Sequence, residues 1–96
     1  MPRLIWTPEA LQDLSRLHAF LAEKSGDVAR RAIGAVRQGV HLLERHPEAG
    51  RPADEMEPEF REWLVEFGAG DYVVLYRFDG NGTVILAVRH VREAGY

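Results

Sequence analysis

The chain has 96 residues and a formal net charge of -3 at pH 7. This length predicts a single domain over residues 1–96. The sequence contains no cysteine, which excludes disulfides, thiolate chemistry and cysteine-ligated zinc. No stretch approaches the roughly 20 apolar residues of a membrane span, so we expect a cytoplasmic protein with no membrane partner.

The first half of the chain has the pattern of a short strand followed by a helical hairpin. Residues 3–6 are a strand candidate, and Thr7 can cap a helix that has Pro8 in its first turn. Helical spacing predicts a helix over residues 8–24 and a second helix over residues 28–45. The apolar stripe of the first helix consists of Ala10, Leu11, Leu14, Leu17, Phe20 and Leu21. The short turn between the helices predicts an antiparallel pair.

The second half reads as a loop followed by three strands. Residues 46–58 contain three prolines and are predicted to form the loop. The segments 59–67, 71–78 and 83–91 are rich in apolar and β-branched residues, and the DGNG between the last two is a hairpin turn signal. We therefore predict an α+β fold of order βααβββ, with the N-terminal strand and the helical hairpin packed on a small, mainly antiparallel sheet.

Alternation within the strands assigns residues to faces of the sheet. Tyr72, Val74, Tyr76 and Phe78 share one face of the middle strand, and Val73, Leu75 and Arg77 share the other. Both faces are largely apolar, so the pattern leaves open which one meets the helices. We expect the following aromatic side chains to belong to the core: Trp6, Phe20, Phe60 and Phe78. The sheet face left free by the helices should collect some of these cations: Arg61, Arg77, Arg89 and Arg92.

The order of several short motifs resembles one known superfamily. The segments TPEALQDL, HPEAGRP, FRE, DYVVLYRF and ILAVRHVRE occur in this order between about residue 4 and residue 93. Together they are similar to the RelE/ParE superfamily of toxins from bacterial toxin–antitoxin modules. The resemblance implies a small cytoplasmic toxin that is held inactive by an antitoxin encoded beside it.

RelE-like members of this superfamily cut messenger RNA in the ribosome, which requires clustered cations and a group that transfers protons. For that activity the resemblance implies Arg61, Arg92 and Tyr96 as catalytic candidates. His90 is an added candidate, because it lies at the end of the last predicted strand. Two positions depart from the ribonuclease pattern, because Val73 and Trp63 stand where it has cations. The net charge is also acidic, whereas a protein that contacts many phosphates usually carries a basic excess.

ParE-like members resemble binding poisons that trap DNA gyrase without chemistry of their own. An acidic domain is no handicap for that role, so we predict a gyrase poison that is not an enzyme. Arginine and tyrosine are enriched in interface hot spots, and the predicted target-binding residues are Arg61, Arg77, Arg89, His90, Arg92 and Tyr96. The ribosome-dependent messenger RNA endonuclease remains the alternative.

The resemblance also implies a protein partner. We predict that a disordered C-terminal segment of a ParD-like antitoxin wraps around the chain and forms a heterotetramer or a larger complex. A helix in a groove is one expected mode of binding, with the following antitoxin contacts on the first helix: Leu11, Leu14, Leu17 and Leu21. We expect no cofactor. We also expect no metal site, since His18 and His41 lack a partner histidine at helical spacing.

Overall fold

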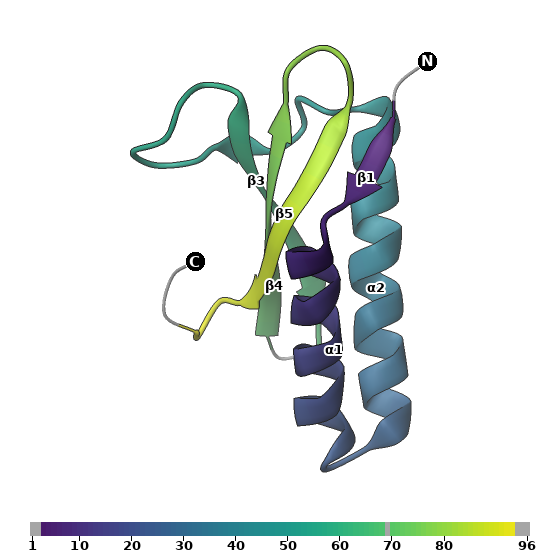
Figure 1. Cartoon of the computed structure of the whole chain (residues 1–96). Coiled ribbons are helices and arrows are strands. Elements are labelled where there is room, and N and C mark those ends of the chain that lie inside the picture. Colours follow the sequence, from purple (N-terminus) through teal and green to yellow (C-terminus); the bar gives the residue numbers. More distant parts are fainter. Residues whose placement is uncertain (1–2, 69, 94–96) are drawn as a thin grey trace.

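A computed structural model describes residues 3–68 and 70–93 of the chain. Its elements are β1 (Leu4–Trp6), α1 (Pro8–Ala22), α2 (Gly26–Arg45), β2 (Arg51–Pro52), β3 (Phe60–Phe67), β4 (Gly70–Phe78) and β5 (Thr83–His90). Helices α1 and α2 lie side by side and cover one face of the sheet (Figure 1). The predicted α+β class, with a helical hairpin packed on a mainly antiparallel sheet, is confirmed.

The sheet has five strands in the described residues, in the order β1-β5-β4-β3-β2. Strand β1 pairs in parallel with β5, and the remaining neighbours are antiparallel. The prediction of an unbroken loop over residues 46–58 is wrong at β2, where Arg51 pairs with Glu62 and Pro52 pairs with Arg61. A two-residue strand that contains proline gives no alternation to detect, and proline is tolerated there because β2 is an edge strand.

Capping side chains fix where both helices begin. The Thr7 hydroxyl accepts a hydrogen bond from the Ala10 amide at 3.1 Å and donates one to the Ile85 carbonyl at 2.9 Å. The cap of α1 is thereby tied to β5. Ser25 accepts from the Val28 amide at 3.2 Å, so α2 begins at Gly26, two residues earlier than predicted. Such caps supply partners for amides that have none within the helix.

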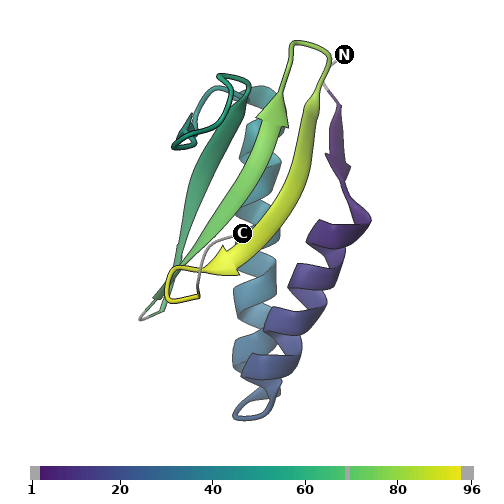
Figure 2. The same ribbon diagram turned by 60° about the vertical axis from the view of Figure 1, so that its left-hand side comes forward.

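The core lies between the helices and the face of β4 that carries Tyr72, Val74 and Tyr76. Their packing in one cluster with residues of both helices answers the question that alternation left open. Val73 and Leu75, which are also buried, lie on the opposite face. The expectation that Phe20 is a core residue is wrong, because its exposed fraction is 69%. Figure 2 shows the reason: the end of the helical hairpin projects beyond the end of the sheet. In the described residues no helix is both long and apolar enough to cross a membrane.

Candidate functional site

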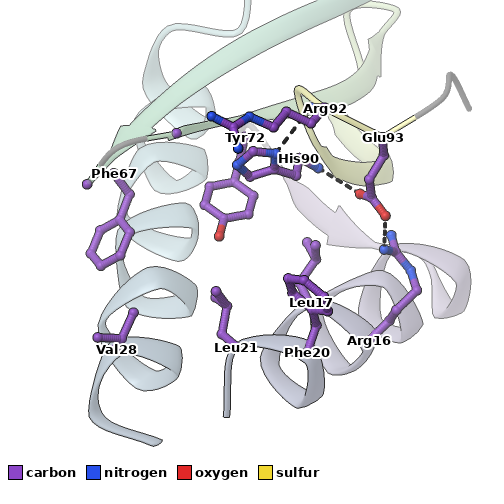
Figure 3. Close-up of a pocket in the computed structure, with 12 residues that line it drawn as sticks. Arg16, Leu17, Phe20, Leu21, Val28, Phe67, Tyr72, His90, Arg92 and Glu93 are labelled. Carbon is purple, nitrogen blue, oxygen red and sulfur yellow. Dashed lines mark hydrogen bonds and ion pairs between the residues drawn. The ribbon is translucent and has the colours of Figure 1, made fainter. Parts of the chain in front are cut away.

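A pocket of about 660 Å³ lies between the projecting end of the helical hairpin and the nearby end of the sheet. Figure 3 shows its walls, which come from α1, the start of α2, the end of β3 with the turn after it, the start of β4, and the end of β5 with the segment after it. The apolar lining consists of Leu17, Phe20, Leu21, Val28 and Phe67. The polar lining consists of Arg16, Tyr72, His90, Arg92 and Glu93.

Tyr72 brings a hydroxyl group into this apolar pocket. The residue is only 3% exposed, and in Figure 3 its hydroxyl points into the pocket. The hydroxyl has no hydrogen-bond partner among residues 3–68 and 70–93. Burial raises the pKa of Tyr72, and the negative charge of Glu93 raises it further. The phenol therefore stays protonated at neutral pH and is available to donate or accept a hydrogen bond from an occupant.

The His90 ring is held in place beside Tyr72. The two rings meet edge to face, with centroids 5.3 Å apart and an interplanar angle of 86°. Nδ1 of His90 accepts a hydrogen bond from the Arg92 amide at 3.1 Å. A Cβ atom on Gly70 would collide with the imidazole Nε2, so the absence of a side chain there makes room for the ring. The Nδ1 atom of His90 is thus already hydrogen-bonded to a backbone amide of the chain.

The charged groups at the mouth of the pocket are unequally compensated. Arg16 forms an ion pair with Glu93 and a second one with Asp13 at 3.4 Å. Glu93 also accepts a hydrogen bond from the His90 amide at 2.8 Å. The exposed Arg92 guanidinium, in contrast, has no ion pair within the described part of the chain. Among the described residues, Arg92 is thus the lining cation whose charge is not offset by a carboxylate.

A second polar cluster lies at the far end of the same sheet face. The Tyr76 hydroxyl donates to the Pro47 carbonyl at 2.6 Å and accepts from the Gly50 amide at 2.9 Å. Arg61 donates to the Gly50 carbonyl at 2.8 Å and to the Glu48 carbonyl at 3.3 Å. Burial raises the pKa of Tyr76, and this effect outweighs the hydrogen bond from the Gly50 amide, which lowers the pKa. We use the name "loop clamp" for this cluster, which consists of Tyr76, Arg61 and the loop backbone to which they are hydrogen-bonded.

Arg77 and Arg89 lie on the sheet face that the helices leave free. In the strand register Arg89 pairs with Val73, which alternates with the core-facing residues of β4. Arg89 donates to the carbonyls of His90 at 3.4 Å and Glu93 at 3.5 Å. Arg77 contacts Asp79 at 3.4 Å. The free face therefore collects two of the four cations suggested for it, while Arg61 lies on the helix-covered face.

The six residues predicted to bind a target thus fall into separate groups. Arg77 and Arg89 share the free face, His90 and Arg92 line the pocket, and Arg61 belongs to the loop clamp. Tyr96 lies outside the described residues.

The four leucines predicted to contact an antitoxin also differ in accessibility. Leu14 and Leu17 are core residues, each 4% exposed, whereas Leu11 is 42% exposed. Leu17 and Leu21 line the pocket, together with Phe20, which the sequence analysis had assigned to the core. The position of Phe20 at the last turn of α1, next to the short connection to α2, was the signal that could have revealed its exposure.

Comparison with known proteins identifies the class to which this chain belongs. The model of the family described as "ParE toxin of type II toxin-antitoxin system, parDE" matches residues 4–95. The chain is therefore a toxin of the type II toxin–antitoxin class. Within that class it belongs to the ParE toxin family, a part of the RelE/ParE superfamily.

Two curated toxins of Caulobacter vibrioides are similar in sequence over most of the chain. Toxin RelE3 is 34% identical over 86 residues, which is 90% of each protein. Toxin ParE3 is 30% identical over 89 residues, which is 92% of this chain and 85% of that toxin. Similarity thus extends to proteins named after both branches of the superfamily.

Two solved structures share the fold. A chain of the chromosomal ParDE TA system from P. aeruginosa superposes with a TM-score of 0.78 at 22% identity, over 96% of this chain and 98% of that one. A chain of the toxin–antitoxin complex RelBE2 from Mycobacterium tuberculosis gives a TM-score of 0.64 at 26% identity, over 94% and 99% of the two chains.

Proposed function

We propose that this toxin acts in the cytoplasm as a binding poison of DNA gyrase. In this account it inhibits bacterial growth without catalysing a reaction of its own. The free sheet face and the segment after β5 bind the target through Arg77, Arg89 and Arg92. Arginine suits such a surface because its planar guanidinium makes several directed hydrogen bonds and also packs on flat groups.

The observation that supports binding over ribonuclease chemistry is the separation of the candidate catalytic groups. Arg61 is paired in register with Tyr76, and His90 is paired with Tyr72. Four residues of extended strand separate these positions, roughly 13 Å at about 3.3 Å per residue. A general acid or base must come within hydrogen-bond reach of the atom on which it acts.

A ParD-like antitoxin is the proposed neutralising partner, and the pocket beside α1 is its proposed docking site. The pocket offers a large exposed aromatic side chain, Phe20, beside Leu17 and Leu21. Such a surface suits a partner helix or extended segment that inserts apolar anchors. A heterotetramer or a larger assembly then follows if the antitoxin dimerises outside its toxin-binding segment.

Expression of the toxin without its antitoxin tests the proposed target. Induced cells should accumulate covalent gyrase–DNA complexes and show DNA damage within minutes, while protein synthesis continues. The double variant Arg77→Ala/Arg89→Ala should lose most of this effect, whereas Arg45→Ala, which removes an exposed cation at the end of α2, should keep it. An immediate halt of translation with cleaved messages would instead establish the ribonuclease alternative.

Coexpression with the product of the neighbouring gene tests the proposed partner. The two proteins should copurify, and the pair should allow normal growth. Light scattering of the purified complex gives its stoichiometry. A neighbouring product that neither copurifies with the toxin nor restores growth would contradict the antitoxin assignment.

A further inference from the structure

The pocket has the size and the composition of a site for one or two large side chains. Its volume of about 660 Å³ is within the range of well-formed ligand sites, roughly 300 to 1,000 Å³. Phe20 stands 69% exposed at its edge, although an aromatic ring gains free energy from burial. An apolar occupant that covers Phe20 would therefore gain buried area from both surfaces.

The charges at the mouth define what must accompany this apolar group. The charge of Arg16 is already offset by Glu93 and Asp13, but Arg92 has no carboxylate partner within residues 3–68 and 70–93. Figure 3 shows the Arg92 side chain extended above the rings of His90 and Tyr72. An occupant that covers the pocket would displace some of the water that hydrates this guanidinium. A carboxylate on the occupant would compensate by a charge-assisted hydrogen bond, whereas a basic segment would be repelled.

We infer that the pocket receives an acidic–apolar segment of the antitoxin, in which one large apolar side chain fills the cavity and a neighbouring carboxylate pairs with Arg92. The Tyr72 hydroxyl supplies a further hydrogen bond to the occupant. This inference rests on the proposed function and goes beyond it, because it specifies the chemistry of the partner segment and the residue that recognises its charge.

A second consequence concerns how neutralisation works. Arg92 belongs both to the pocket and to the proposed target-binding surface, while Arg77 and Arg89 lie on the opposite face of the sheet. An antitoxin carboxylate on Arg92 would deprive the target of that cation even if the free face stayed uncovered. Neutralisation is then a direct competition for Arg92.

Titration calorimetry with the purified neighbouring gene product measures the role of Arg92 in antitoxin binding. Arg92→Glu should weaken the affinity by at least about tenfold, since reversal replaces an ion pair by repulsion. Phe20→Ala should weaken it by a similar factor through lost apolar contact. The matched control Arg45→Glu reverses an exposed cation at the far end of α2 and should change the affinity by less than about twofold. Near-ultraviolet circular dichroism and the thermal midpoint show whether each variant is folded.

The outcomes separate this inference from the proposed function. If Phe20→Ala weakens binding and Arg92→Glu does not, the acidic chemistry of the partner is wrong, but docking in the pocket stands. If neither variant differs from Arg45→Glu, the pocket is not the antitoxin site. If the wild-type toxin does not bind the neighbouring gene product at all, the proposed antitoxin partner fails, while the proposed gyrase target is still tested by the expression experiment above.

An anionic dye gives a readout that does not depend on the antitoxin. Anilinonaphthalene sulfonate carries apolar rings beside a negative charge, which is the chemistry inferred for the occupant. The folded wild-type chain should bind the dye, and Arg92→Gln and Phe20→Ala should each bind it several-fold more weakly. Binding of the dye with equal affinity by wild type and both variants would overturn the inferred role of Arg92 and Phe20.

Discussion

Two tyrosines on the same face of β4, Tyr72 and Tyr76, differ in the hydrogen bonds of their hydroxyl groups. The Tyr76 hydroxyl donates to Pro47 and accepts from Gly50, so its hydrogen bonds are made within the chain. The Tyr72 hydroxyl lines a pocket and has no hydrogen-bond partner in the described residues. Both side chains are nearly inaccessible to solvent, at 0% exposed for Tyr76 and 3% for Tyr72. Burial alone therefore does not distinguish a structural tyrosine from one that is available to a partner.

The comparison extends to the arginine near each tyrosine. Arg61 binds two loop carbonyls beside Tyr76, whereas Arg92 lacks an ion pair at the mouth of the pocket that Tyr72 lines, as far as the structure describes the chain. Polar groups that are satisfied internally stabilise the fold, and groups left unsatisfied at a cavity favour a ligand. The polar groups at one end of the sheet thus support the fold, and those at the other end are the proposed recognition site.

The substitution Gly50→Ala is the strongest test of the claim that the loop clamp stabilises the fold. An added Cβ would lie 2.5 Å from the Tyr76 hydroxyl and 2.6 Å from the Glu62 carbonyl, so the loop clamp must shift. We expect a loss of about 1 to 3 kcal/mol or more in the free energy of unfolding. Gly34→Ala is the control, because nothing lies within 4 Å of its added Cβ, and it should stabilise the helix by up to about 1 kcal/mol. Urea unfolding of both variants gives the comparison, and equal stabilities would contradict it.

Removing each tyrosine hydroxyl compares the two ends directly. Tyr76→Phe leaves the buried Gly50 amide without its acceptor, which should cost about 1 to 3 kcal/mol. Tyr72→Phe removes a hydroxyl with no hydrogen-bond partner in the described residues and should change stability by less than about 0.5 kcal/mol. In antitoxin binding the order should reverse, with Tyr72→Phe the more harmful per folded molecule. A larger stability loss for Tyr72→Phe would refute the assignment.

Replacing Arg61 asks whether this residue acts through the loop or on the target. Arg61→Met removes the hydrogen bonds to Glu48 and Gly50 and should destabilise the chain by about 1 kcal/mol. Toxicity per folded molecule should stay near the wild-type level, while Arg89→Ala should reduce it. Growth assays scaled to the amount of folded toxin measure this difference. Loss of toxicity by Arg61→Met at unchanged stability would return Arg61 to the target-binding surface.

The smallest expected effect is on stability at alkaline pH. Burial raises the pKa of Tyr72 and Tyr76 above the ordinary value of 10.0. The folded state thus holds both phenolic protons more tightly than the unfolded state does. Their contribution to stability is complete below about pH 10 and decreases as the pH rises through the folded-state pKa values. Above about pH 9 the urea midpoint should decrease less steeply with pH in the double variant Tyr72→Phe/Tyr76→Phe than in the wild type. Equal slopes for the two proteins would argue against the raised pKa values.

Local patterns in the sequence predicted most of the fold. The cap at Thr7, the helical stripes and the DGNG turn act over a few residues, so one segment at a time reveals them. Strand β2 was missed because two residues are too few to show the alternation of side chains that marks a strand. The helix-facing side of β4 could not be chosen because Val73 and Leu75 are as apolar as the residues that alternate with them.

The site was less predictable because it depends on contacts between distant segments. The pocket brings together residues from α1, α2, the turn between β3 and β4, the start of β4, and the end of β5. The resemblance suggested Arg92, to which His90 was added as a candidate, and both residues line the pocket. It gave no indication that Arg61 would bind the carbonyls of residues 48 and 50, since that contact follows from the path of the loop.

The most direct test of the central claim, that this toxin is a binding poison, uses purified components. The toxin is incubated with DNA gyrase, ATP and plasmid, and in parallel with ribosomes that hold a defined message. We predict that detergent treatment releases linear plasmid with gyrase covalently attached, that added antitoxin suppresses this product, and that the message stays intact. Cleavage of the message on ribosomes, with no broken plasmid in the gyrase reaction, would contradict the account.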